Sequence, residues 1–213
     1  MNEALPPRSI VYVVDDDVSV RNSLSNLFRS VDLSVQVFSS SASFLQHELP
    51  DVASCIVLDI RLPGSSGLDF QAELRSVGIK IPIIFLTGHG DIKMSVQAMK
   101  AGAIDFLTKP YRDQEILDAV RAALERDTRR READTAALDL RARFDRLSKR
   151  EREIMALVTS GLMNKQAAVK AGIAETTVKI HRGNVMQKMG AKSFAELVRM
   201  ADTLQIRRAK SQK

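Results

Sequence analysis

Short apolar runs alternate with amphipathic stretches up to residue 112 of this chain. After the first run, Val20, Leu24 and Phe28 recur at the spacing of one face of a helix. Apolar runs of this length separated by helices are typical of a doubly wound parallel α/β sheet. The pattern predicts five strands, within Ile10–Val14, Leu33–Phe38, Cys55–Leu58, Ile81–Leu86 and Ile104–Thr108.

A stretch without helix-breaking residues follows the fifth strand. Asp113 is the predicted N-cap of a helix, and residues 114–147 contain neither Gly nor Pro. The pattern predicts a long helix, or a helix that frays into a linker. A heptad seam that starts at Leu117 would place Asp127 and Arg131 at core positions, so a stable coiled coil is not expected.

From Leu147 onward the pattern is entirely helical. The first helix is predicted to begin after Ser148, which forms a capping box with Glu151, and to end at Gly161. Two short helices separated by a Gly-containing turn are typical of a helix-turn-helix. The three later helices are predicted at Asn164–Ala171, Glu175–Met189 and Phe194–Leu204.

Polar residues follow the predicted strands of the first half. Asp15 and Asp16 follow the first strand, Asp59 the third, Thr87 the fourth, and Lys109 the fifth. The carboxyl ends of parallel strands gather along one edge of a sheet, so these five residues are expected in one crevice. Such a group could bind a divalent cation, with Mg²⁺ best suited, and handle a phosphoryl group. Each residue alone would more often be structural or solvated, but the five together favour a site.

Asp59 has two predicted roles in this crevice. It could be the third carboxylate ligand of the cation, and also a nucleophile that accepts a phosphoryl group as an acyl phosphate. Lys109 would neutralise charge on the transferring oxygens, and Thr87 could donate a hydrogen bond to the phosphoryl group.

The charge of the chain is divided unevenly between its halves. Residues 1–127 carry 12 Lys and Arg against 17 Asp and Glu, whereas residues 128–213 carry 20 against 9. An acidic half followed by a basic half indicates two domains with different partners, the second a polyanion. The alternative is a basic, solvated surface with no partner.

The remaining composition favours a cytoplasmic protein. The single cysteine, Cys55, excludes an intramolecular disulfide and fits a small buried residue in a reducing compartment. No apolar stretch approaches the roughly 20 residues needed to span a bilayer, so no membrane partner is expected. Residues 1–9 have no apolar segment typical of a secretory signal.

Residues 9–127 resemble the receiver domain of bacterial two-component response regulators. The resemblance covers this whole half, and residues 128–146 are then interpreted as a helical linker. The matching motifs are VVDDD (Val13–Asp17), LDIRLPGSSG (Leu58–Gly67), FLTGHGD (Phe85–Asp91) and AGAIDFLTKP (Ala101–Pro110).

The resemblance implies a phosphoacceptor and a metal site. Asp59 would accept a phosphoryl group from a cognate histidine kinase. Asp15, Asp16 and the backbone carbonyl of Arg61 would help Asp59 to hold Mg²⁺ as the cofactor. The domain would catalyse only its own phosphorylation and dephosphorylation, so no other enzyme activity is expected.

The resemblance also implies a switch. Thr87 and Phe106 would form the switch pair, and the peptide bond between Lys109 and Pro110 is expected to be cis. Arg61 and His89, each two residues beyond a site residue, would flank the phosphoryl group.

Residues 147–206 resemble the helix-turn-helix domain of LuxR-type regulators. With the receiver-like half, this is the arrangement of the FixJ/NarL family of transcription factors, which implies promoter DNA as a partner and RNA polymerase as a further one. The matching motifs lie at Leu147–Arg152, Gly161–Gln166, Thr177–Gly190 and Ser193–Ala201.

The predicted recognition helix divides into two faces. Val178, Val185 and Met189 recur on a face that is expected to be buried. On the other side, Lys179 could donate to guanine edges or phosphates, and Ile180 could pack on a thymine methyl group. The other candidate DNA contacts are Thr176 and Thr177 at the helix start, Arg182 and Lys188 as phosphate contacts or solvated residues, and Gly183, which leaves one base contact absent.

Phosphorylation is expected to act through dimerisation. One helix-turn-helix reads a single half-site, and two copies would supply the specificity that a genome requires. The polar heptad after Leu117 cannot hold a permanent dimer, so the unphosphorylated chain is expected to be largely monomeric. The interface is expected around Met94, Met99 and Ala103.

Two other functional classes remain open at this stage. One is a metal-dependent aspartyl-phosphate phosphatase, which needs a second carboxylate two residues after its nucleophile, where this chain has Arg61. The other is a binding module whose receiver is never phosphorylated, although the complete set of five site residues argues against it.

Overall fold

The structure, a computed structural model, describes residues 9–88 and 92–206. They group into two compact units, Met1–Arg131 and Glu132–Lys213, and the boundary lies within the predicted linker. Among the described residues, no helix has the length and apolar character needed to cross a membrane.

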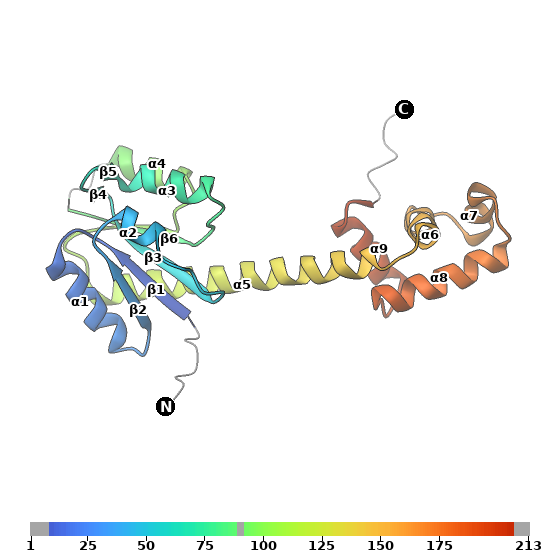
Figure 1. The fold of residues 1–213 in the computed structure, drawn as a ribbon, viewed down its shortest axis with the longest axis horizontal. Coiled ribbons are helices and arrows are strands. Elements are labelled where there is room, and N and C mark those ends of the chain that lie inside the picture. Colours follow the sequence, from blue (N-terminus) through green and yellow to red (C-terminus); the bar gives the residue numbers. More distant parts are fainter. Residues whose placement is uncertain (1–8, 89–91, 207–213) are drawn as a thin grey trace. The chain divides into compact units, whose positions relative to one another are not determined.

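The first unit is built around a five-stranded parallel sheet, as predicted. The strand order is β2-β1-β3-β6-β7, and every neighbouring pair is parallel. Helices cover both faces (Figure 1). The elements are β1 (Ser9–Val14), α1 (Val18–Arg29), β2 (Ser34–Phe38), α2 (Ser41–Leu45), β3 (Ala53–Asp59), β4 (Arg61–Leu62), β5 (Ser65–Ser66), α3 (Gly67–Ser76), β6 (Ile83–Thr87), α4 (Ile92–Lys100), β7 (Asp105–Thr108) and α5 (Asp113–Asp145).

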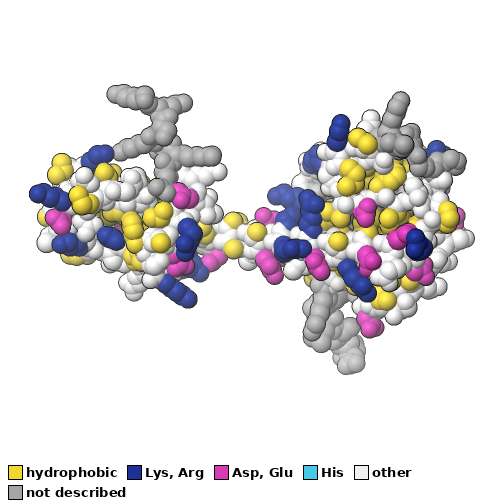
Figure 2. Space-filling model, turned by 180° about the vertical axis from the view of Figure 1, so that it is seen from behind, with side chains coloured by type: hydrophobic (Ala, Val, Ile, Leu, Met, Phe, Trp, Pro, Cys, Tyr) yellow, Lys and Arg dark blue, Asp and Glu magenta, His cyan; other side chains and the backbone are white. Residues whose placement is uncertain are grey.

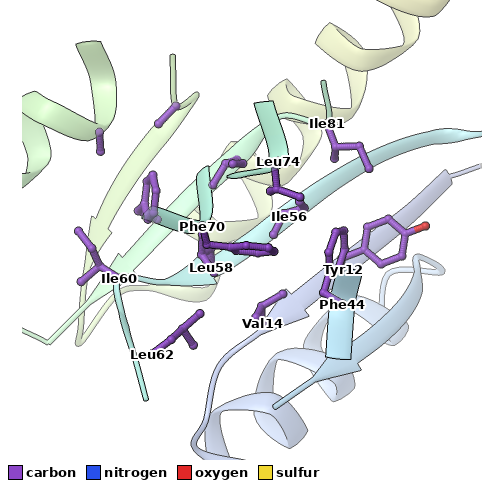
Figure 3. Close-up of a cluster of buried hydrophobic side chains, with 14 of the residues drawn as sticks. Tyr12, Val14, Phe44, Ile56, Leu58, Ile60, Leu62, Phe70, Leu74 and Ile81 are labelled. Atoms are coloured by element: carbon purple, nitrogen blue, oxygen red, sulfur yellow. The ribbon is translucent and has the colours of Figure 1, made fainter. Parts of the chain in front are cut away.

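Alternate residues of the central strands enter two separate cores. Because successive side chains point to opposite faces of a sheet, Tyr12 packs with Phe44 and Phe70 under α2 and α3, a cluster shown in Figure 3. Val11 and Val13, on the other face, pack against α1 and α5. The strands are apolar on both faces, which explains their nearly continuous hydrophobic runs.

A small antiparallel pairing after β3, in which Arg61 faces Ser66, is not among the five predicted strands. One local prediction for this unit is wrong. Asp113 is the first residue of α5 rather than its N-cap. The first turn is instead stabilised by Glu115, whose carboxylate accepts a hydrogen bond from the backbone N–H of Arg112 at 3.1 Å.

Helix α5 is one continuous helix of 33 residues. Its first part supplies Ile116 and Val120 to the core of the first unit. Its last part belongs to the second unit, where Leu140 and Phe144 pack on that unit's own core. The fraying that the sequence left open is therefore absent from Asp113–Asp145.

The second unit consists of short helices, as predicted. The capping box of Ser148 and Glu151 is present at the start of the first of them. Two later helices end at Gly172 and Gly190, both with positive φ, which non-glycine residues rarely adopt. The helices are α6 (Lys149–Thr159), α7 (Asn164–Ala171), α8 (Glu175–Met189) and α9 (Phe194–Thr203).

Candidate functional site

The carboxyl edge of the sheet brings three carboxylates together. Asp15 follows β1, and Asp59 ends the neighbouring strand β3. Together with Asp16, these side chains place one carboxylate oxygen each within 4.8 Å of one another. Because β1 and β3 lie where the strand order reverses, the cluster occupies the position where open α/β sheets bind ligands.

Lys109, which directly follows the edge strand β7, also reaches this cluster. Its ammonium group donates to Oδ2 of Asp15 at 2.8 Å and to Oδ2 of Asp59 at 2.6 Å. Its backbone N–H donates to the carbonyl of Thr87 at 2.6 Å, which fixes the segment after β7 against the end of β6. Four strand ends therefore converge on one ion cluster.

The second oxygen of each paired carboxylate is held by the backbone. Oδ1 of Asp15 accepts from the N–H of Asp17 at 2.9 Å, and Oδ1 of Asp59 accepts from the N–H of Arg61 at 2.8 Å. These contacts orient both groups, while Asp16 remains exposed.

The burial of the cluster shifts its protonation equilibria. Burial raises the pKa of Asp15 above its ordinary value, and the hydrogen bond from Lys109 offsets only part of this effect. For Lys109, burial lowers the pKa, but hydrogen bonds to Asp15 and Asp59 raise it by more, so its pKa is raised overall. Three carboxylates face one ammonium group, and this excess of negative charge suits a divalent cation.

The predicted switch residues lie on the adjacent strands. Thr87 is buried at the end of β6, and Phe106 is half-buried on β7, with its ring 6.5 Å from that of Phe85. The peptide bond between Lys109 and Pro110 is cis, as expected. His89 lies outside the described residues.

Gly67 supports the site in a way that the sequence analysis missed. A Cβ atom at this position would lie 2.8 Å from the carbonyl oxygen of Asp59 and 3.0 Å from Cα of Ile60. Only glycine allows the first turn of α3 to approach the end of β3 so closely. The Gly in the motif after Asp59 was the available signal.

In the second unit, α8 exposes part of the predicted DNA-binding face. Val178, Val185 and Met189 are fully buried, as the spacing predicted. The side chain of Lys179 is 61% exposed and forms an ion pair with Glu175 at 3.3 Å. Also exposed are Thr176, Ile180 and Gly183, whereas Thr177 is half-buried.

Arg182 is engaged inside the second unit. Its guanidinium lies 4.4 Å from the centre of the Phe194 ring and donates to Oδ1 of Asn164 at 3.3 Å. Arg182 is half-buried and is held by these contacts as well as by solvent.

Lys188 is engaged as well. It donates to both carboxylate oxygens of Glu151, at 2.8 and 2.7 Å. Burial raises the pKa of Glu151, but hydrogen bonds from Lys188 and Ser148 lower it by more, so its pKa is lowered overall. The side chain of Lys188 ties α8 to the start of α6, while 42% of it stays exposed to solvent.

Two exposed amides on α8 were missed by the sequence analysis. Asn184 and Gln187 lie one and two turns after Ile180 and are exposed on the same side as Gly183. Amide side chains can bond adenine through two hydrogen bonds in a major groove. The helical spacing from Ile180 was the signal that would have found them.

Known protein families match both halves of the chain. Residues 11–121 match the model of the response regulator receiver domain, and residues 145–201 match that of bacterial regulatory proteins of the luxR family. Nodulation protein W of Bradyrhizobium diazoefficiens is 60% identical over 199 residues, which are 93% of this chain and 88% of that protein. The transcriptional regulatory protein FixJ of Rhizobium meliloti is 43% identical, over 90% of this chain and 94% of its own.

Solved structures extend the comparison to the fold. The response regulator StyR is 47% identical and matches with a TM-score of 0.82, over 92% of this chain and 98% of its own. Full-length FixJ from B. japonicum is 35% identical, with a TM-score of 0.56 over 94% of this chain and 98% of its own. The chain belongs to the response regulators that carry a receiver domain followed by a LuxR-type DNA-binding domain.

Proposed function

We propose that Asp59 accepts a phosphoryl group from a histidine kinase and that the phosphorylated chain binds promoter DNA as a dimer. The observation that carries this proposal is the ammonium group of Lys109, which bonds Asp15 and Asp59 at once. An ammonium group that is bonded to both the acceptor carboxylate and a buried carboxylate can offset the negative charge that develops at the acceptor during phosphoryl transfer.

Transfer would begin with a carboxylate oxygen of Asp59 that attacks the phosphorus atom of a phosphohistidine. The P–N bond breaks as the new P–O bond forms, and the imidazole leaves with the electron pair. Asp15, Asp16, Asp59 and the carbonyl of Arg61 would hold Mg²⁺, whose chemistry is to offset the negative charge of the phosphoryl oxygens. Hydrolysis of the acyl phosphate later restores Asp59.

The new phosphoryl group would act on the switch residues. The Thr87 hydroxyl lies at the same sheet edge as Asp59 and would donate to a phosphoryl oxygen. Phe106 pairs with Phe85 on the neighbouring strand and would follow the movement of Thr87. This change would alter the surface formed by α4 and the start of α5.

The dimer surface would lie on α4. Val96 is 45% exposed and Met99 is 46% exposed, and their spacing of three positions on one helix would let both contact a second copy. Ala103, which the sequence analysis included in this surface, is buried and therefore cannot contribute. Met94 is half-buried and packs against the core.

On DNA, α8 would enter the major groove with Lys179 and Ile180 facing base edges. Thr176 and Thr177 would contact phosphates near the helix start. Gly183 offers no side chain, and Arg182 and Lys188 would contribute mainly through the contacts they make within the unit. The DNA partner implies action in the cytoplasm, and control of transcription would end in contact with RNA polymerase.

Mass spectrometry tests the phosphoacceptor. The full chain is treated with acetyl phosphate and Mg²⁺, and a gain of about 80 Da, one phosphoryl group, is expected. Asp59→Asn should show no gain, whereas Asp118→Asn, an exposed carboxylate on α5, should behave as the unaltered chain. A retained adduct on Asp59→Asn would move the acceptor to another residue.

Sedimentation velocity tests the dimer. The unphosphorylated chain should sediment as a monomer and the phosphorylated chain as a dimer, while Met99→Asp should remain a monomer in both states. A dimer of unchanged mass in both states would contradict this mechanism.

A further inference from the structure

A cavity of about 370 Å³ lies at the amino edge of the receiver sheet, opposite the Asp59 cluster. It is formed by α3, the segment before β6, the turn before β7 and the segment of α5 around Asp127. Its wall includes Leu74, Ile79 and Ile81, of which Leu74 and Ile81 are seen near each other in Figure 3. Its volume is within the usual range for small-molecule sites.

Positive charge dominates the lining of this cavity. Arg75, Lys80, Arg126 and Arg130 contribute to it, against the single carboxylate of Asp127. Lys and Arg side chains gather over the part of the receiver from which α5 emerges (Figure 2). A cavity with this imbalance favours an anion.

Two of these four cations make neither an ion pair nor a hydrogen bond in the described part of the chain. Arg130 is paired with Asp127, and Arg75 donates to the carbonyl of Ala101. Within residues 9–88 and 92–206, neither Lys80 nor Arg126 makes an ion pair. Both side chains are exposed and are therefore available to a ligand.

A buried hydrogen-bond acceptor, the amide oxygen of Gln71, belongs to a residue that lines the same cavity. Gln71 is 5% exposed, and its Nε2 donates to the carbonyl of Ala101 at 3.1 Å. This contact fixes the amide, since the reversed orientation would bring two acceptors together. Its Oε1 is buried without a hydrogen-bond donor in the described part of the chain, which is an unfavourable state that a ligand hydroxyl would relieve.

We propose that this cavity binds a small organic anion that carries at least two negative charges and a hydroxyl group. Lys80 and Arg126 would bind the charged groups, and the hydroxyl would donate to Oε1 of Gln71. Hydroxycarboxylates and phosphate esters share this chemistry. The site is independent of phosphorylation at Asp59.

Protection of Lys80 from an amine-reactive reagent tests the proposal in the full chain without Mg²⁺. Citrate and glycerol 3-phosphate are the two probes, and labelling is measured by mass spectrometry of peptides. At a probe concentration about ten times Kd, labelling of Lys80 should fall roughly tenfold by mass action. Lys100, an exposed lysine of α4 outside this cavity, should be labelled at an unchanged rate. Protection by only one probe identifies the anion class and supports the proposal.

Matched variants and a matched ligand complete the test. Arg126→Gln should abolish the protection of Lys80, whereas Arg129→Gln, an exposed residue three positions later outside this cavity, should retain it. Tricarballylate, which is citrate without its hydroxyl, should protect more weakly than citrate. The proposal is overturned if neither probe protects Lys80, if Lys100 is protected equally, or if Arg126→Gln keeps full protection. Equal protection by citrate and tricarballylate would overturn the role of Gln71.

Discussion

Two ion clusters lie at opposite edges of the receiver sheet, and they differ in the balance of charge. At the carboxyl edge, the carboxylates of Asp15, Asp16 and Asp59 face the single ammonium group of Lys109. At the amino edge, the carboxylates of Asp127 and Asp51 face the guanidinium groups of Arg130 and Arg131, so the charges are balanced.

The carboxylate of Asp127 has no unused oxygen. Oδ1 accepts from Arg130, while Oδ2 accepts from Arg131 at 2.7 Å and from the backbone N–H of Ser54 at 3.0 Å. It therefore ties α5 to the start of β3 and has no capacity for a cation. The Asp59 cluster keeps a surplus of carboxylate. The charge balance, rather than the presence of charged residues, separates a structural cluster from a site.

The largest expected effect is on stability. Asp127→Ala removes a fully buried carboxylate from two guanidinium groups and leaves the N–H of Ser54 without its acceptor. We expect the free energy of unfolding to fall by about 2–4 kcal/mol in urea denaturation followed by circular dichroism. Asp118→Ala, at an exposed pair on the same helix, should cost less than about 0.5 kcal/mol. Equal losses in both variants would show that the Asp127 cluster stabilises the fold no more than an exposed ion pair does.

We expect different roles for two lysines of α8, Lys179 and Lys188. Lys179→Ala should weaken operator binding by about 1–3 kcal/mol with a smaller loss on random DNA, because a base contact is lost. Lys188→Ala should lower the free energy of unfolding by about 1–3 kcal/mol, because the buried Glu151 loses its cation. Fluorescence anisotropy at several salt concentrations separates the two, since Lys188→Ala should leave the salt slope unchanged. A slope reduced by about one would make Lys188 a phosphate contact instead.

Asp15→Asn should have a stability effect of the opposite sign to Asp127→Ala. Burial of Asp15 disfavours its charged form, so a neutral amide is expected to leave the free energy of unfolding unchanged or raise it by up to about 1 kcal/mol. Phosphorylation by acetyl phosphate should nevertheless slow strongly, because a proposed ligand of Mg²⁺ is lost. A variant that is both destabilised and fully phosphorylated would contradict the assignment.

The smallest expected effect is a difference in pH dependence. The folded-state pKa of Asp15 is raised above its ordinary value of 3.8. Between pH 3.8 and the folded-state pKa, the folded chain therefore binds more protons than the unfolded chain. As the pH falls through this window, the unaltered chain should therefore gain stability relative to Asp15→Asn.

Glu151 should show the reverse trend. Its folded-state pKa is lowered below 4.5, so its contribution is present above pH 4.5 and is lost as the pH falls through the folded value. Relative to Glu151→Gln, the unaltered chain should lose stability over that range. Urea denaturation in steps from about pH 7 to about pH 3 measures both differences, and parallel trends would refute the opposite pKa shifts.

Much of the fold could be predicted because it follows from local patterns. The bounds of α7 and α8 agree with the spacing of apolar residues between glycines. The residues of the Asp59 cluster were predictable because parallel strands bring their carboxyl ends together, so the position of each residue in its strand was sufficient.

Contacts between distant segments could not be read in the same way. Asp127 was noticed only as a residue unsuited to a coiled coil, although it is bonded to Ser54, 73 positions earlier. Lys188 pairs with Glu151 across 37 positions. Both residues lie on helices, where a charged side chain is ordinarily solvated. No periodic pattern in the sequence indicates the distant partner of either residue.

Gly183 has a consequence for how the regulator could diverge. A Cβ atom at this position would meet nothing within 4 Å, so a side chain can be added on the exposed side of α8 without a clash at Cβ. A glycine inside a helix costs about 0.5–1 kcal/mol relative to alanine, so most replacements would also strengthen the helix. A duplicated gene could therefore acquire a new promoter preference through one codon, with no compensating change in the protein core.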